Sequence, residues 1–132
     1  MDIHTVTDSF AVSPQIIPED VETLAKEGYT TIICNRPDDE ERGQPSFEAV
    51  ANAATQWGLK SHHLPIVSGM LGPQHVSQMA ELITESDGKV FAYCRSGTRS
   101  IMLWAFDQIE KRPREDVVKL ASNAGYDLSQ QL

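Results

Sequence analysis

Short apolar runs alternate with helical patterns of apolar residues along this chain. Runs rich in β-branched or aromatic residues predict strands over 10–13, 30–34 and 89–93, and a weaker pattern predicts another over 60–64. Between and after these runs apolar residues recur at helical spacing, which predicts helices that begin near Pro18, Ser46, Pro73, Arg99 and Pro113. This alternation favours an α/β fold with a mainly parallel central sheet flanked by helices.

A polar loop, 35–45, and a second loop, 65–72, follow predicted strands, and Cys94 directly follows a third strand. The carboxyl ends of neighbouring parallel strands meet at one edge of the sheet, and ligands bind at that edge. We therefore expect Cys94 and both loops to lie there together.

The size and charge of the chain narrow its partners. Its 132 residues fit one domain, and we treat 1–132 as a single unit. The net charge of −8 disfavours nucleic acid and anionic membranes as partners, so that any bound anion needs a locally positive site. No apolar run is long enough to cross a bilayer, and the first ten residues do not resemble a signal peptide. We expect a cytoplasmic protein.

Metal-binding patterns are not visible in the sequence. Cys34 and Cys94 are too few for a disulfide framework or a cysteine-based zinc site. His62 and His63 are adjacent on a predicted strand, so their side chains point to opposite faces, and one of them could lie near the pocket. His75 lies near a helix start and resembles a surface residue. We expect no metal and no other cofactor.

The candidate chemistry lies in the loop from Tyr93 to Ser100, which joins a predicted buried strand to a predicted buried helix. The small residues Ser96, Gly97 and Thr98 allow a tight turn, and Gly97 can adopt a positive φ angle. Such a turn points successive backbone N–H groups into one concavity that binds anions. The loop therefore predicts an anion site that also holds the sulfur of Cys94 as a thiolate.

Arginines frame this loop. Arg99 offers a planar fork of donors to an oxyanion, which makes it the main partner of Cys94. Arg95 either widens the positive rim or is an ordinary exposed residue. Arg36 either adds a second cation to the site or pairs on the surface with the acidic residues 38–40. The alternative for the whole loop is a buried structural Cys94 in a tight turn, which the coincidence of cysteine, glycine, arginine and context disfavours.

Cys34 ends one predicted parallel strand as Cys94 follows another. If these strands are neighbours, their Cα atoms could lie within the ~7 Å that a disulfide needs. Oxidised Cys94 could then be rescued by a disulfide with Cys34. The alternative is that Cys34 is a small buried residue without a chemical role.

Two families share features with this chain. The loop resembles the active-site loop of rhodanese-type sulfurtransferases, from Tyr93 through Cys94 and the Arg-Ser-Gly that follows. The longer stretch 10–125 resembles the bacterial beta-lactamase-hydrolase-like family, which is grouped by fold with tyrosine and dual-specificity phosphatases. The matching segments are Phe10–Ile16, Asn35–Glu40, the cysteine loop and Ala124–Tyr126. This resemblance implies a dual-specificity-phosphatase-like fold.

The chain departs from true phosphatases at three points. Four residues separate Cys94 from Arg99 where phosphatases have five, and Tyr93 replaces their usual histidine. The loop 64–70 lacks the aspartic acid that protonates the leaving group in those enzymes. The nearby candidates for a substitute acid are Asp38 and Asp39, and the alternative is that they form a solvated acidic turn.

The resemblance also suggests a role for Ser100, whose hydroxyl would hydrogen-bond the Cys94 sulfur; alternatively Ser100 caps the helix. Three functions follow. The first is a cysteine-dependent phosphatase-like hydrolase of a small anionic substrate or a phosphoprotein, which we expect from the whole-chain resemblance. The second is a sulfurtransferase with a sulfur donor and a thiol acceptor, which the loop favours because sulfur transfer needs no acid. The third is a catalytically weak anion-binding or redox-sensing module.

Overall fold

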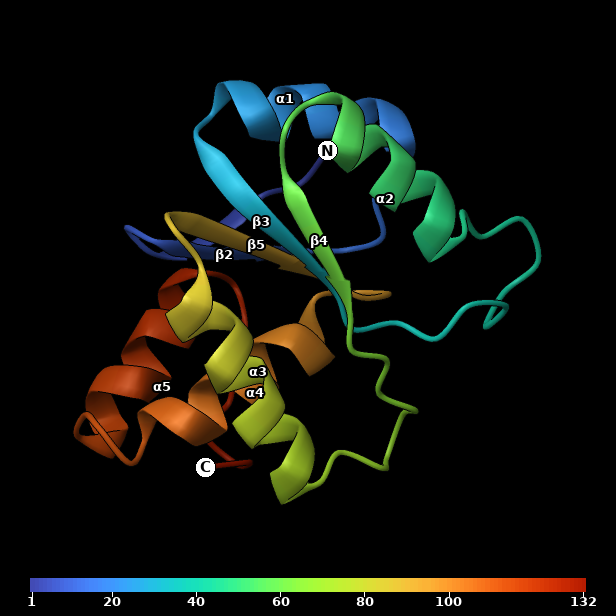
Figure 1. Cartoon of the computed structure of the whole chain (residues 1–132). Coiled ribbons are helices and arrows are strands. Elements are labelled where there is room, and N and C mark those ends of the chain that lie inside the picture. Colours follow the sequence, from blue (N-terminus) through green and yellow to red (C-terminus); the bar gives the residue numbers. More distant parts are fainter.

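The computed structural model describes residues 1–132 of the chain. A five-stranded sheet forms the centre of the molecule. The strands lie in the order β1-β2-β5-β3-β4 (Figure 1). Their bounds are β1 His4–Thr7, β2 Phe10–Ser13, β3 Tyr29–Cys34, β4 Lys60–His63 and β5 Lys89–Tyr93. Four of them, β2 to β5, run parallel, and β1 pairs antiparallel with β2. The predicted mainly parallel sheet is confirmed.

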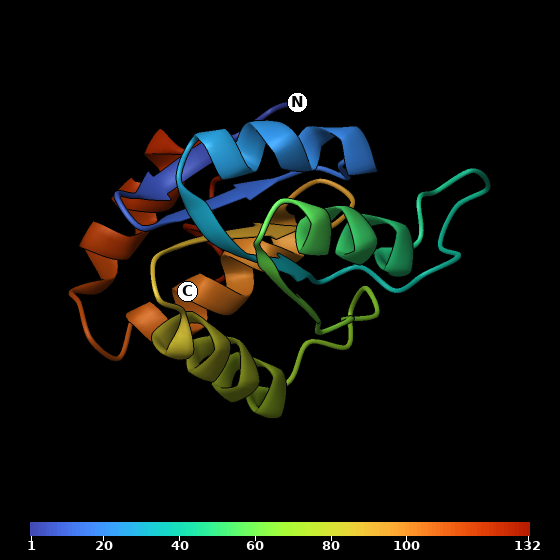
Figure 2. The ribbon, with the colours of Figure 1, turned by 45° about the horizontal axis from the view of Figure 1, so that its top comes forward.

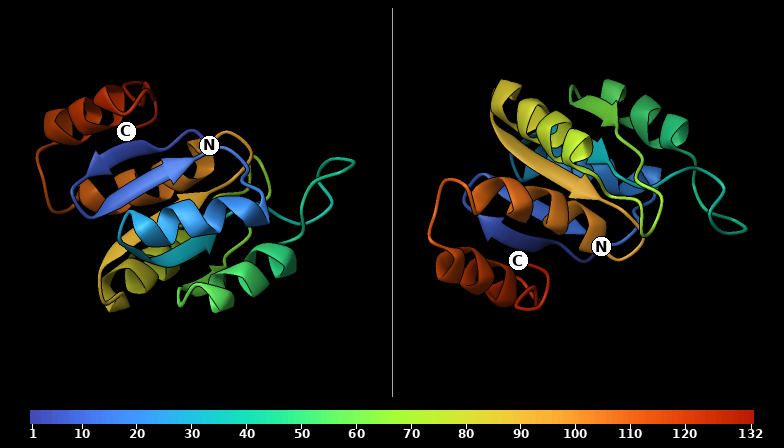
Figure 3. Two further views of the ribbon diagram at one scale, coloured as in Figure 1. Left: turned by 90° about the horizontal axis from the view of Figure 1, so that it is seen from above. Right: turned by 90° about the horizontal axis from the view of Figure 1, so that it is seen from below.

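Helices cover both faces of the sheet, as Figure 2 and the two views of Figure 3 show. A 3-10 turn (Pro18–Asp20), α1 (Val21–Lys26) and α2 (Phe47–Gln56) lie on one face. The other face carries α3 (Pro73–Glu85), α4 (Thr98–Gln108) and α5 (Arg114–Asn123). None of these helices combines the length and apolarity that crossing a membrane requires.

Alternating side chains of the strands build two hydrophobic cores, one on each face. Ile32 and Phe91 are paired across β3 and β5 and pack in the core with α1 and α2. Their neighbours Ile33 and Ala92 point the other way, into the core with α4 and α5. Because both faces are covered, these strands read as continuous apolar runs in the sequence.

The strand β1 was not predicted from the sequence. Its residues, His-Thr-Val-Thr, contain one buried apolar side chain, Val6, and form a strand because β2 offers a hairpin partner across a short turn. The helix predicted to begin at Pro18 instead opens with a 3-10 turn and continues as the short α1. The weakly supported strand at 60–64 is confirmed as β4, which lies at the sheet edge with a partly exposed pattern.

The carboxyl ends of the parallel strands are level with one another. Tyr93, the last residue of β5, is paired with Ser13 of β2 and with Cys34 of β3, and Cys34 is paired with His63 of β4. Cys94 and the loops 35–45 and 65–72 therefore leave the sheet at one edge, as expected. The loop between β3 and α2 extends outward there (Figure 1).

Candidate active site

The cysteine loop is fixed by backbone hydrogen bonds to both neighbouring strands. The N–H of Cys94 donates to the Ser13 carbonyl at 3.4 Å, and the N–H of Gln15 donates to the Arg95 carbonyl at 3.3 Å. On the other side, Asn35 N–H donates to the Tyr93 carbonyl at 2.8 Å. The loop therefore continues the sheet for one step before α4 begins at Thr98.

Cys94 is fully buried and lies in the loop between β5 and α4. The backbone N–H of Gly97 donates to its Sγ at 3.1 Å. Gly97 has φ +92°, the left-handed conformation expected from the sequence, and it forms the N-cap of the helix. The Cys94 sulfur is thus hydrogen-bonded to the N-cap residue of α4.

Arg99 is hydrogen-bonded to residues outside the cysteine loop. Its Nη1 and Nη2 donate to the two carboxylate oxygens of Glu40 at 2.7 and 2.9 Å, and Nη1 also donates to the Ile66 carbonyl at 2.7 Å. Because a guanidinium has five N–H groups, this leaves the Nε–H and one Nη2–H, which lie on the same side and form a second fork. The hydrogen bonds to Glu40, and secondarily the nearby Cys94, raise the pKa of Arg99. Arg99 thus remains charged and keeps one fork for an anion.

Glu40 connects two arginines. The side chain of Glu40 is turned inward and 22% exposed, and its Oε1 also accepts from Arg36 Nε at 2.8 Å. The hydrogen bonds from Arg99, followed by those from Arg36, hold the pKa of Glu40 at about 2, although partial burial opposes this. The carboxylate is therefore ionised near neutral pH. From the sequence, Glu40 was expected only as a surface partner of Arg36.

Arg36 is paired with Glu40, but it is not on the surface: it is 1% exposed. Its other nitrogens donate to Gln15 Oε1 at 3.0 Å and to Glu41 Oε1 at 3.4 Å. Since its guanidinium is used in this way, Arg36 is linked to the site through Glu40. Arg95 is exposed and lies 3.6 Å from Glu41, which places it on the outer rim.

Ser100 lies within α4, and its hydroxyl donates to Asn35 Oδ1 at 2.8 Å. A serine hydroxyl has one proton to donate, so it does not donate to the Cys94 sulfur in this geometry, and the N-cap is Gly97 instead. Asn35 was not predicted as a site residue. It is fully buried and its Nδ2 donates to the Leu64 carbonyl at 3.1 Å, so it ties α4 to the loop that follows β4.

The side-chain hydroxyls of Ser96 and Thr98, at the start of α4, are hydrogen-bonded to each other. Ser96 Oγ lies 2.9 Å from Thr98 Oγ1, and the Thr98 N–H is 3.4 Å from Ser96 Oγ. Both residues are exposed, so neither hydroxyl stabilises the protein core.

The two candidate acids have structural surroundings. Asp38 Oδ1 accepts the backbone N–H of Phe47 at 2.9 Å, which satisfies a free donor at the start of α2. Asp39 is exposed and adopts φ +63° in the turn. The exposure of both residues and the contact of Asp38 with α2 favour the alternative of a solvated acidic turn.

His63 and His75 each make a contact that supports the local structure. His63 Nε2 is hydrogen-bonded to the Arg36 carbonyl at 2.9 Å, and its ring stacks on Phe47 at 4.6 Å between centroids. His63 is thus the histidine that supports the loop after β3. His75 Nδ1 accepts the N–H of Gly72 at 2.9 Å, at the start of α3.

Cys34 lies on a strand that neighbours the one before Cys94, as the disulfide hypothesis requires. It is buried, its thiol donates to the Arg36 carbonyl at 3.3 Å, and burial raises its pKa. In register it is paired with Tyr93, and its side chain belongs to the core beneath α1 and α2. A Cys34–Cys94 disulfide stays a prediction.

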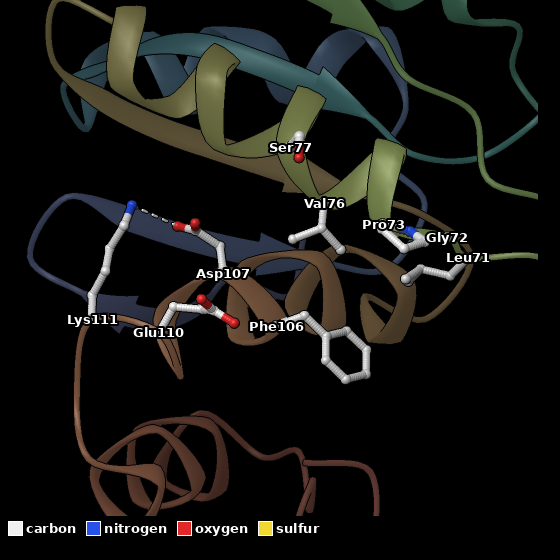
Figure 4. A pocket seen from close by; sticks show the side chains of 9 residues that line it. All are labelled: Leu71, Gly72, Pro73, Val76, Ser77, Phe106, Asp107, Glu110 and Lys111. Carbon is white, nitrogen blue, oxygen red and sulfur yellow. Dashed lines mark hydrogen bonds and ion pairs between the residues drawn. The ribbon is translucent and has the colours of Figure 1, made fainter.

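A cavity of about 620 Å³ lies between α3 and α4 (Figure 4). Val76 and Phe106 line it together with an ion pair between Asp107 and Lys111 at 3.0 Å. None of its lining residues belongs to the cysteine loop. The cavity is therefore separate from the cysteine loop.

The family is identified by comparison with known proteins. A family model described as "Beta-lactamase hydrolase-like protein, phosphatase-like domain" matches residues 2–111. This chain belongs to that family. Curated relatives named beta-lactamase hydrolase-like protein are 32% identical over 130 residues in Xylella fastidiosa and 27% identical over 125 residues in Agrobacterium fabrum. The alignments cover 97% and 93% of this chain but 30% and 29% of the relatives, which are much longer.

Solved structures agree with this family. A candidate phosphatase from Neisseria meningitidis is 36% identical with a TM-score of 0.88, over 97% of this chain and 92% of the other. A variant of TpbA from P. aeruginosa, in complex with pTyr, is 14% identical with a TM-score of 0.70, over 97% and 76%. The second comparison shows the fold alone. The predicted family and its dual-specificity-phosphatase-like fold are therefore confirmed.

Proposed function

We propose that this domain is a cysteine-dependent hydrolase of phosphoesters in which Cys94 is the nucleophile. The observation that carries the proposal is the position of the sulfur. It accepts the Gly97 N–H at the start of α4, beside an arginine that retains one free fork. The family and its phosphatase-like neighbours support this chemistry.

The reaction would have two steps. The Cys94 thiolate attacks phosphorus, the bond to the leaving oxygen breaks, and that oxygen takes up a proton. Water then attacks the phosphocysteine and releases phosphate and the thiolate. Loop N–H groups and the free fork of Arg99 would hold the equatorial oxygens, where negative charge is spread in the transition state.

The surroundings of the site favour substrates with good leaving groups. Glu40 has a pKa of about 2 and is already ionised, so it does not donate a proton at neutral pH. Asp38 is engaged with the start of α2. We therefore expect aryl phosphates, whose leaving oxygen needs less help from an acid, to react faster than alkyl phosphates.

A rhodanese-type sulfurtransferase is the second candidate, and the short spacing between Cys94 and Arg99 favours it. The thiolate would attack the sulfane sulfur of thiosulfate, form a Cys94 persulfide and release sulfite. An acceptor thiolate would then attack the outer sulfur and regenerate the Cys94 thiolate. Neither step needs a general acid.

One pair of assays tests both candidates. Purified protein is given p-nitrophenyl phosphate and, separately, thiosulfate with an acceptor thiol, and each assay is repeated with Cys94→Ser. Cys34→Ser is the matched control, because it changes the other buried cysteine in the same way. We expect phosphate release that Cys94→Ser abolishes and Cys34→Ser largely retains.

Other results lead to different conclusions. Sulfur transfer without phosphate release would refute the hydrolase and establish the second candidate. If both assays are silent and inorganic phosphate still binds, the domain is an anion-binding module, the third function expected from the sequence.

A further inference from the structure

Tyr126 reaches the cysteine loop from the segment that follows α5. Its hydroxyl donates to the carbonyl oxygen of Ser96 at 2.7 Å, across 30 residues of sequence. The ring of Tyr126 is half-buried and contacts His4 edge-on, with centroids 5.1 Å apart. His4 is held in turn by a hydrogen bond of 2.6 Å between its Nδ1 and the Ala124 carbonyl. The hydroxyl is therefore supported by its own packed surroundings.

The Ser96 carbonyl and the Gly97 N–H belong to one peptide unit. A trans peptide is planar, so its C=O and its N–H point in opposite directions. The C=O of this unit accepts the Tyr126 hydroxyl, and the N–H donates to Cys94 Sγ at 3.1 Å. Tyr126 and Cys94 thus hold the same peptide from its two sides.

This peptide needs an external constraint because Gly97 follows it. Glycine has no Cβ, so rotation of the Ser96–Gly97 peptide meets little steric resistance. After rotation by half a turn, the Ser96 oxygen would face the sulfur and would repel a thiolate or a bound anion. The hydrogen bond from Tyr126 is lost in that rotated state and therefore disfavours it.

The packing of Tyr126 against the loop is close. A Cβ built at Gly97 would overlap the Tyr126 hydroxyl and would also come within 3.3 Å of the Ser13 carbonyl. A glycine at this position is thus required both by its φ of +92° and by the approach of the tyrosine.

We propose that Tyr126 is a positioning residue that locks the Ser96–Gly97 peptide with its N–H toward the Cys94 sulfur and the anion that binds there. The inference rests on Cys94 as the nucleophile of the proposed function, and it holds whether phosphorus or sulfur is attacked. Partial burial, followed by the nearby Cys94, raises the pKa of Tyr126 to about 12, so the hydroxyl keeps its proton and remains a donor over the working range of pH.

Tyr126→Phe tests the inference, because it removes the hydroxyl and keeps the ring. The first readout is the rate of iodoacetamide alkylation at Cys94 against pH, followed by mass spectrometry of the peptide that contains it. A net hydrogen bond of about 0.5–1.5 kcal/mol corresponds to roughly 2- to 13-fold, so we expect alkylation at pH 6 to slow by about that factor.

Tyr29→Phe is the matched control. Tyr29 begins β3 and packs edge-on against Phe91. The substitution Tyr29→Phe also removes only a hydroxyl. It should leave the alkylation profile unchanged. If Tyr126→Phe lowers the unfolding temperature but gives the wild-type alkylation profile, the hydroxyl is merely structural and the inference is wrong.

A second readout separates this inference from the proposed function. The amide proton of Gly97 donates to sulfur, so its NMR resonance should move upfield in Tyr126→Phe when that hydrogen bond is weakened. If Cys94 is unreactive toward iodoacetamide at every pH in the wild type, the proposed nucleophile fails, and the Gly97 resonance still decides the inference. An unchanged resonance overturns it.

Discussion

Glu40→Gln removes one negative charge from between two arginines while keeping the size of the side chain. Gln Oε1 can replace one of the acceptors for Arg99, but its amide N–H₂ then faces donors of the guanidinium groups. Arg36, which is 1% exposed, keeps only the weaker contact with Glu41 at 3.4 Å as a charged partner. A buried cation that loses its counter-ion destabilises the folded state.

The size of the effect follows from the pKa of Glu40, which falls from 4.5 to about 2 on folding. At about 1.36 kcal/mol for each pKa unit, this corresponds to an upper figure of about 3.4 kcal/mol. Because the surrounding loop is open to solvent, screening reduces it, and we expect Glu40→Gln to lower the free energy of unfolding by about 1–2 kcal/mol at pH 7.

The pH dependence has a definite sign. The folded-state pKa lies below the unfolded-state value, so the stabilisation is complete above about pH 4.5 and is lost as the pH falls towards 2. The difference between wild type and Glu40→Gln should therefore be largest at pH 7 and narrow steadily below pH 4.5.

Urea unfolding at several pH values measures this difference. With m near 2 kcal/mol/M, the expected loss moves the midpoint by about 0.5–1 M at pH 7. Glu81→Gln, on the exposed side of α3 and without an ion pair, is the control and should unfold like the wild type. A Glu40→Gln midpoint equal to that of Glu81→Gln at pH 7, or a gap that widens in acid, would refute the reasoning.

Two further substitutions test contacts around the loop. Asn35→Ala leaves the Leu64 carbonyl and the Ser100 hydroxyl without a buried partner, so it should lower the free energy of unfolding by about 2–4 kcal/mol in urea titration. A loss below about 0.5 kcal/mol would contradict that role. Gly97→Ala adds a Cβ that would overlap the Tyr126 hydroxyl, at a residue with a positive φ. Calorimetry should therefore show a free energy of unfolding that is lower by about 1–3 kcal/mol. A Gly97→Ala variant as stable as the wild type would contradict this explanation.

Much of the fold was predictable because its signals are local. Continuous apolar runs at 30–34 and 89–93 identify strands covered on both faces, and Pro73 marks the start of α3. β1 was missed because four residues with one buried apolar side chain carry almost no periodic signal. Its conformation is decided by pairing with β2, which forms only in the folded chain.

Local sequence specifies the loop that carries Cys94. Its tight turn and the positive φ of Gly97 depend on residues that are neighbours in the chain. Tertiary packing selects the side chains that support this loop. Arg99 and Glu40 are 59 positions apart, Ser100 and Asn35 are 65 apart, and Tyr126 and Ser96 are 30 apart. The first two contacts form because the parallel strands β3 and β5 end at one edge of the sheet. The third forms because the segment after α5 packs against the cysteine loop. No local pattern specifies which side chains meet there.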